Sequence, residues 1–165
     1  MARFSVVATG GTFDEIHAGH IALLQKAFEV GQKVIIGVSS DEFAYKNKGK
    51  KLNYDFEQRV QNLRKTIKAE FGDVDYVIAK LDNHFGPAVT TGDVQALVAS
   101  SETQSKGGLL NEIRAEKGLK PVQVIAVDLV KAEDGQPISS SRIRRGEIDK
   151  QGRLLKDDSR GLNNS

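Results

Sequence analysis

The stretch from Thr9 to His20 holds the residues best suited to chemistry in this chain. Its paired glycines, ending at Gly11, would let backbone N–H groups approach an anion, and a helix beginning near His17 would add unpaired donors and the positive end of its dipole. His17 and His20 are three residues apart, a spacing that places both imidazoles on one face of a helix. The pattern predicts a phosphate-binding loop between a strand and a helix, with Gly19 keeping the first turn free of a side chain.

Two other interpretations compete with phosphate binding. A glycine pair after a strand is often a tight turn, and two histidines at this spacing can form half of a metal site. The chain has no cysteine and only one further histidine, His84, so a zinc site would have to recruit carboxylates that no spacing singles out. The common nucleotide motifs are also absent, since there is no Gly-x-Gly-x-x-Gly and Gly49-Lys50-Lys51 lacks the other residues of a P-loop. Phosphate binding is therefore favoured.

Length and composition favour one ordinary domain. We expect that domain to span residues 1–150 of the 165, with a polar tail at 151–165. A formal net charge of +2 is too small for a protein that wraps nucleic acid, so small anions are the expected partners. The lack of cysteine suits a reducing compartment, and no apolar stretch approaches the roughly 20 residues of a membrane span. A cytoplasmic monomer is expected, with no membrane or nucleic-acid partner.

Alternating apolar runs predict the elements that hold the loop. Five short runs rich in β-branched residues are expected as buried strands. They cover residues 3–9, 34–38, 75–79, 95–100 and 121–127. Helices are expected over residues 18–30 and 55–71, and in the second of these Arg59 and Arg64 are expected on the solvent side. Strand–helix–strand units with short links predict an α/β fold, a single three-layer domain with a mostly parallel five-stranded sheet.

Four lysines between residues 46 and 51 follow the second predicted strand and a short helix expected to begin near Asp41. Such a run is usually a solvated surface. The carboxyl ends of parallel strands, however, form the edge at which open α/β sheets bind ligands. A mobile basic loop at this edge favours a phosphate site that includes Lys48 and Lys50.

Three serines, Ser139, Ser140 and Ser141, precede a short basic helix near the end of the chain. They could simply cap that helix. Serine hydroxyls and free helix N–H groups can also hold several phosphate oxygens at once, and the guanidinium of Arg144 would add a bidentate charge. We favour phosphate binding at this segment.

Two segments carry a resemblance to a known family. Gly11-Thr12-Phe13-Asp14-x-x-His17-x-Gly19-His20 resembles the signature of the cytidylyltransferase-like nucleotidyltransferases, and Ile138-Ser139-Ser140-Ser141-Arg142-Ile143-Arg144 is similar to their Ile-Ser-Ser-Thr-x-Ile-Arg motif. Within that superfamily, the chain is most similar to the archaeal and eukaryotic phosphopantetheine adenylyltransferases. Further segments carry this second resemblance: Ser101-Glu102-Thr103, Asn111-Glu112-Ile113-Arg114, Gly118-Leu119-Lys120-Pro121 and residues 142–149.

The resemblance implies a Rossmann-like fold and adenylyl transfer from ATP to 4′-phosphopantetheine, giving dephospho-coenzyme A and pyrophosphate, with Mg²⁺ on the phosphates. His20 would be the main donor to the transition state, and His17 would also contact the ATP phosphates. The implied ATP and phosphate contacts are Gly11, Thr12, Phe13, Gly19, Ser101, Thr103, Ser139, Ser140, Ser141 and Arg144. The implied acceptor contacts are Thr12, Lys48, Lys50 and Asp82.

The chain departs from this family at one loop. The family usually carries Asp-Pro-Tyr-Gly-Pro-Thr where this sequence has Asp82-Asn83-His84-Phe85-Gly86-Pro87-Ala88, which leaves the acceptor contacts there open. Asn111 and Arg114 carry over to the nucleotide site only weakly, and Asp14 stays open between orienting a lysine and capping the helix. Two alternatives remain for the function: a sister nucleotidyltransferase acting on nicotinamide mononucleotide or using CTP, and a non-catalytic nucleotide- or RNA-binding module.

Overall fold

Five short apolar strands pair side by side into one sheet. The computed structural model describes residues 3–48, 52–82, 93–100, 106–127, 133–135, 138, 143, 146–149 and 152–155. Its elements are β1 (Phe4–Gly11), α1 (Ala18–Val30), β2 (Gly31–Ser39), α2 (Asp41–Lys48), α3 (Phe56–Phe71), β3 (Tyr76–Leu81), β4 (Ala96–Ser100), α5 (Lys106–Glu116) and β5 (Gln123–Val127). The strand order is β3-β2-β1-β4-β5, and all neighbouring pairs are parallel. The predicted α/β fold with a five-stranded parallel sheet is confirmed.

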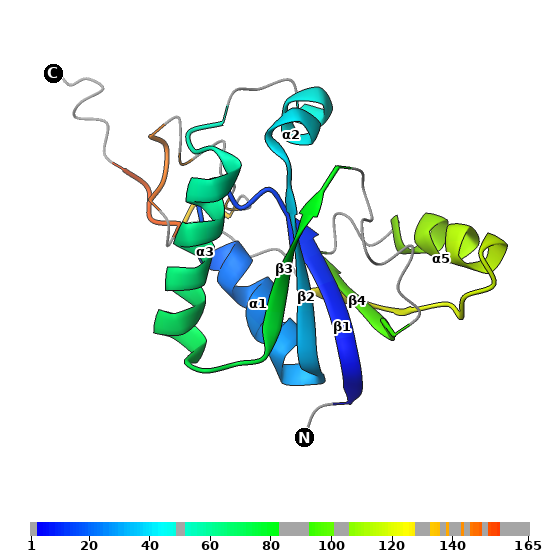
Figure 1. Ribbon diagram of the computed structural model, residues 1–165. Coiled ribbons are helices and arrows are strands. Elements are labelled where there is room, and N and C mark those ends of the chain that lie inside the picture. Colours follow the sequence, from blue (N-terminus) through cyan, green and yellow to red (C-terminus); the bar gives the residue numbers. More distant parts are fainter. Residues whose placement is uncertain are drawn as a thin grey trace, which may run out of the picture.

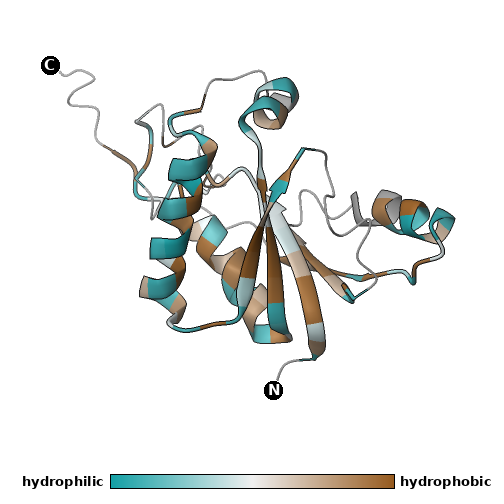
Figure 2. Cartoon of the chain, in the orientation of Figure 1, coloured by the Kyte–Doolittle hydropathy of each residue, from teal (hydrophilic) through white to brown (hydrophobic). Residues whose placement is uncertain are grey.

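Helices cover both faces of this sheet (Figure 1). Successive strand side chains point to opposite faces, so Val7 packs with Leu24 of α1 and Leu63 of α3, whereas the next residue, Ala8, packs with Leu110 of α5. The strands are largely hydrophobic along their length, and α3 has a hydrophilic outer side (Figure 2). Because all five strands are parallel, their carboxyl ends meet at one edge, where loops can build a site.

Local signals end α1 and α3 where the sequence predicts. The Asp55 carboxylate accepts a hydrogen bond of 2.8 Å from the Gln58 N–H at the start of α3, and Gly72, with φ of +74°, ends it. Helix α1 runs directly into β2 at Gly31. A Cβ on this glycine would lie 2.6 Å from a methyl carbon of Val7, so only glycine allows the helix to meet the sheet without a loop.

Two local expectations are wrong. The paired glycines do not open a loop, because they continue β1, with Gly10 opposite Gly37 and Gly11 opposite Val38 of β2. The missing side chain of Gly10 instead leaves room for Leu81 of β3, since a Cβ on Gly10 would lie 3.3 Å from Leu81 Cδ1 and 3.1 Å from the Gly37 carbonyl oxygen. The basic run is also not all loop, because α2 continues as far as Lys48.

The described residues near the end of the chain pack against its first half. Ile148 forms an isolated antiparallel bridge with Leu154, and Ile138 and Ile148 are buried together beside Ala18, the first residue of α1. A boundary at residue 150 followed by a polar tail stays a prediction. None of the helices in the described ranges is long and apolar enough to cross a membrane.

Candidate active site

The turn after β1 brings an aromatic residue in an uncommon conformation to the carboxyl edge. Phe13 has φ of +54°, in the left-handed region that large side chains rarely adopt, and its side chain is fully buried. Its ring lies 4.9 Å from the His20 ring, centroid to centroid, and a Cβ on Gly11 would come within 3.3 Å of it. Backbone conformations of this kind cluster at functional sites.

The two histidines form a reciprocal cap at the start of α1. The Gly19 N–H donates to His17 Nδ1 at 3.0 Å, and the His17 N–H donates to His20 Nδ1 at 3.2 Å. The rings stack with centroids 4.0 Å apart, which confirms that the spacing brings the imidazoles together. Because each Nδ1 is an acceptor, the proton of each neutral ring sits on Nε2, and each ring can donate from that nitrogen.

Burial keeps His17 uncharged. The residue is 8% exposed, and burial lowers the pKa of its imidazole from 6.5 to about 4. At neutral pH, His17 is therefore a neutral N–H donor rather than a cation. No acceptor for its Nε2 lies within the part of the chain that the structure describes.

The helix start has fewer free donors than expected. The Gly19 N–H is taken by His17 Nδ1, and the His20 N–H donates to the His17 carbonyl oxygen at 3.0 Å. The expectation that several unpaired backbone donors would meet a phosphate here is therefore wrong, because the His17 imidazole takes one of these groups and the His17 carbonyl oxygen takes the other.

Two buried carboxylates in the same turn hold the segment that follows the lysines. Asp14 accepts from the Asn53 N–H at 3.1 Å and from the Tyr54 N–H at 3.0 Å, and Glu15 accepts from the Asn53 side-chain amide at 2.6 Å. Asp14 does not cap α1, since His17 occupies that position. Asp14 links the turn after β1 to the segment just before α3.

Arg59 is the main correction to the sequence analysis. It was expected on the solvent side of α3, yet it is 0% exposed. Its guanidinium donates to the carbonyl oxygens of Thr12 at 2.7 Å, Ser39 at 2.8 Å and Tyr54 at 3.1 Å, and to the Asp41 carboxylate at 2.7 Å. A signal was available, because Arg59 lies three residues after Phe56 and four before Leu63, on the apolar stripe of its helix. Arg64 is exposed, as predicted.

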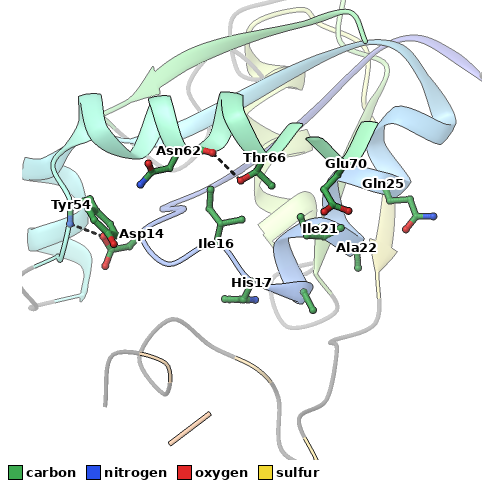
Figure 3. A pocket seen from close by; sticks show the side chains of 11 residues that line it. Asp14, Ile16, His17, Ile21, Ala22, Gln25, Tyr54, Asn62, Thr66 and Glu70 are labelled. Atoms are coloured by element: carbon green, nitrogen blue, oxygen red, sulfur yellow. Dashed lines mark hydrogen bonds between the residues drawn. The ribbon is translucent and has the colours of Figure 1, made fainter. Parts of the chain in front are cut away.

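A groove of about 570 Å³ lies beside His17, between α1 and α3 (Figure 3). Its lining mixes apolar and polar side chains. Figure 3 shows Ile16, from the turn after β1, and Ile21, from α1, on one side of the groove, and Asn62 and Thr66, from α3, on the other. The groove is not predictable from the sequence, because its two walls are far apart in the chain.

Some predicted site residues fall at this edge and others lie outside the described residues. Thr12 is half-buried in the turn, Asp82 is exposed directly after β3, and Lys48 is the last residue of α2. The remaining predicted contacts lie outside the described residues: Lys50, Ser101, Thr103, Ser139, Ser140, Ser141 and Arg144. Within the described ranges, no group of three or more His, Cys, Asp or Glu side chains could hold a metal ion.

Asn111 and Arg114 lie at the opposite edge. The Asn111 side chain exchanges two hydrogen bonds with the backbone of Val122, and buried Arg114 donates to the carbonyl oxygens of Lys120 and Val94. All three partners precede β4 or β5, so both side chains lie at the amino ends of the strands. The weak expectation that these two residues contact the nucleotide is therefore corrected.

Comparison with known proteins agrees with the site geometry. The phosphopantetheine adenylyltransferase of Methanothermobacter thermautotrophicus is 44% identical over 154 residues, covering 93% of this chain and 92% of that protein. The phosphopantetheine adenylyltransferase of Thermococcus kodakarensis is 40% identical over 153 residues, with coverage of 93% and 92%. A protein with unknown function from Archaeoglobus fulgidus has a crystal structure that superposes with a TM-score of 0.67 at 30% identity, covering 76% of this chain and 90% of that one.

The match to a family model runs over residues 8–146, from the end of β1 to beyond the serine-rich segment. It therefore includes both motifs that carry the resemblance in the sequence. This chain belongs to the cytidylyltransferase-like family.

Proposed function

We propose that this protein transfers the adenylyl group of ATP to 4′-phosphopantetheine, releasing pyrophosphate and forming dephospho-coenzyme A. The names of relatives that are 40–44% identical over most of the chain support this choice of substrates. The observation that carries the proposal is the reciprocal cap, which brings two stacked imidazoles to the carboxyl edge with each Nδ1 accepting a backbone N–H. A cytoplasmic location and a monomeric state are part of the same proposal.

The chemistry needs no protein nucleophile. An oxygen of the 4′-phosphate, already an anion at neutral pH, forms a bond to the α-phosphorus of ATP. The bond from that phosphorus to the oxygen bridging to the β-phosphate breaks, and its electron pair leaves with pyrophosphate. Mg²⁺ enters as part of the MgATP substrate and neutralises phosphate charge. The protein has to align the two phosphates and stabilise the five-coordinate transition state.

Three donors at the turn after β1 and the start of α1 are suited to aligning the phosphates and stabilising the transition state. The Nε2–H groups of His20 and His17 would contact oxygens of the ATP phosphates, with His20 as the main transition-state donor. Because His17 stays neutral, it donates without taking a proton from the substrate. The Phe13 N–H would hold the acceptor or transferring phosphate, with Thr12 beside it.

Charged and hydroxyl groups from other loops complete the proposal. Lys48, Lys50 and Asp82 would contact the acceptor, while Ser101 and Thr103 would lie near the nucleotide. Ser139, Ser140, Ser141 and Arg144 would grip the β- and γ-phosphates. Support for the last group comes from Ile138 and Ile143, the described residues on either side of the serines, which pack with Ala18 at the start of α1.

The direct test is mass spectrometry of the products from ATP, Mg²⁺ and 4′-phosphopantetheine. We expect dephospho-coenzyme A and pyrophosphate in equal amounts. A panel with nicotinamide mononucleotide as acceptor and CTP as donor tests the sister reactions. Turnover of another pair in place of 4′-phosphopantetheine and ATP would contradict the proposed substrates, and no turnover with any pair would contradict catalysis itself.

A further inference from the structure

Arg59 is buried at a cost that its contacts must offset. Removing a guanidinium from water is expensive unless its donors are paired. Here the pairing is with three backbone carbonyl oxygens and one carboxylate, which come from four separate places in the chain: Thr12, Ser39, Asp41 and Tyr54. A single side chain thus links the turn after β1, the end of β2, the start of α2 and the segment before α3.

The contact with Thr12 sets the direction of one peptide group. A trans peptide is planar, so its C=O and N–H point in opposite directions. The Thr12 carbonyl oxygen points into the interior, 2.7 Å from Arg59 Nη1, and the N–H of the same peptide, that of Phe13, therefore points away from the guanidinium. Among the described residues, no acceptor lies on this N–H, although Phe13 is 0% exposed. Buried N–H groups are normally paired, so this N–H is a candidate contact for a phosphate that enters the turn.

The other contacts hold both ends of the lysine-bearing segment. Arg59 bonds to Asp41 at the start of α2 and to the Tyr54 carbonyl oxygen after the lysines. Asp14, next to Phe13, accepts hydrogen bonds from the N–H groups of Asn53 and Tyr54. The same residues that orient the Phe13 N–H therefore also determine where the segment from 41 to 54 begins and ends relative to it.

We propose that Arg59 is a positioning residue for adenylyl transfer, which orients the Phe13 N–H toward the phosphate and fixes Asp41 and Tyr54, which precede and follow the lysines. The inference rests on the proposed function and deepens it. Arg59 touches no substrate, because its side chain is 0% exposed and four of its five N–H groups donate to protein oxygens. Its effect on the reaction passes through the peptide between Thr12, whose carbonyl oxygen it holds, and Phe13, whose φ is +54°.

The experiment compares Arg59→Lys and Arg59→Met with Arg114→Met. Arg114 is a matched control, because it is also 0% exposed and also bonds backbone carbonyl oxygens, but at the amino edge. All three variants should lower the Tm. Only the Arg59 variants should lower kcat of the folded protein, by about 10²-fold, since a small misplacement of a positioned group costs this much. Arg59→Lys keeps the charge but has one nitrogen, which cannot reach four separated acceptors.

A second readout does not depend on turnover. In an ¹⁵N NMR titration with inorganic phosphate, which stands in for the acceptor phosphate, the Phe13 amide signal of the parent protein should shift downfield, and in Arg59→Lys this shift should be lost. An unchanged kcat in folded Arg59→Lys, or the same Phe13 shift as in the parent, would overturn the inference. An equal fall in kcat in Arg114→Met would also overturn it, because the effect would then follow from stability. If the parent makes no dephospho-coenzyme A, the proposed function fails, and the titration still tests the role of Arg59.

Discussion

Two fully buried arginines lie at opposite edges of one sheet. Arg59 bonds carbonyl oxygens at or after the carboxyl ends of β1 and β2, and Arg114 bonds carbonyl oxygens that precede β4 and β5. Both are 0% exposed and both lie on helices that pack against the sheet. Burial and hydrogen bonding are therefore not enough to identify a functional arginine. What distinguishes the two arginines is the edge of the sheet whose backbone each guanidinium holds.

The polar groups around the two arginines are used differently. At the amino edge, the Asn111 amide donates to and accepts from the Val122 backbone, so these groups satisfy one another. At the carboxyl edge, the Phe13 N–H and His17 Nε2 have no acceptor within the described residues. Unpaired donors are suited to an anion, whereas paired donors only stabilise the fold.

Lowering the pH should destabilise the carboxyl edge much more than the amino edge. The reason is that His17 titrates between pH 7.5 and 4.5, whereas the Asn111–Arg114 pair does not. The pKa of His17 is about 4 in the folded protein, and its ordinary value is 6.5. Between these two pH values the unfolded chain therefore binds a proton at His17 and the folded chain does not. Its contribution to stability is complete above pH 6.5 and is lost as the pH falls toward 4. We expect a loss of roughly 3 kcal/mol across this window.

Urea unfolding between pH 7.5 and 4.5 measures this loss. His17→Asn is the control, because asparagine can cap a helix but does not titrate. The free energy of unfolding of the parent should fall more steeply with acid than that of the variant. Parallel pH curves for the two proteins would mean that His17 is not held neutral by the fold.

Gly19→Ala should damage the carboxyl edge without weakening the helix. A Cβ on Gly19 would lie 2.8 Å from His17 Cε1 and 3.0 Å from its Nδ1, so the imidazole must move. Alanine also favours a helix over glycine by about 1 kcal/mol, which offsets part of the strain. We expect kcat to fall about 10²-fold, the scale of a misplaced catalytic group, with little change in Tm.

The matched control for Gly19→Ala is Glu29→Gly, an exposed change in the same helix. It should cost about 1 kcal/mol of stability and leave kcat unchanged. Steady-state kinetics and thermal unfolding of both variants give the comparison. A normal kcat in Gly19→Ala would show that the position of the His17 ring does not matter to the reaction.

Removing Lys48 and Lys50 together should affect the acceptor more than ATP. If these lysines neutralise the acceptor phosphate, their replacement by alanine should raise the KM for 4′-phosphopantetheine about tenfold, in the range of one charged hydrogen bond. The KM for ATP should change less. The control is the double replacement of exposed Lys65 and Lys68 on α3. Equal KM values for both double variants would assign the lysine run to a solvated surface.

Asp41→Asn should have the smallest effect of the series. The Asp41 side chain is 54% exposed, and its ion pair with Arg59 is therefore partly screened. Arg59 keeps its three carbonyl contacts in this variant. Urea unfolding should show a loss of less than about 1 kcal/mol, with kcat within about twofold of the parent. A fall in kcat as large as that of Arg59→Lys would move the positioning role from the carbonyl contacts to the ion pair.

The strands and the long helices could be predicted because their signals are local. Apolar runs mark β1 and β2, and Asp55 and Gly72 mark the ends of α3. The pairing of the histidines was also predictable, since three residues separate them. The role of Arg59 was missed because its key acceptors, Thr12 and Ser39, lie 47 and 20 residues away in the chain. A charged residue on an apolar stripe indicates burial, but its partners become visible only in the fold.

The glycine pair shows a different limit. Gly10 and Gly11 are typical of a phosphate loop by composition, yet they end a strand. What decides their role is the Gly37 carbonyl oxygen of β2 and Leu81 of β3 beside Gly10, and the ring of Phe13 beside Gly11, which occupy the space that side chains would fill. Such packing reasons for glycine cannot be read from a single segment.

The most direct measurement of the proposed mechanism is kcat of His20→Ala and His20→Gln with ATP and 4′-phosphopantetheine. Glutamine at this position retains an acceptor for the His17 N–H, so it preserves the helix cap while removing the imidazole donor. We predict that kcat falls by about 10²-fold or more in both variants, with a smaller change in the Kd for ATP, as expected for a donor that acts mainly in the transition state. A near-normal kcat in folded, ATP-binding His20→Gln would contradict the account and leave His20 as a capping residue only.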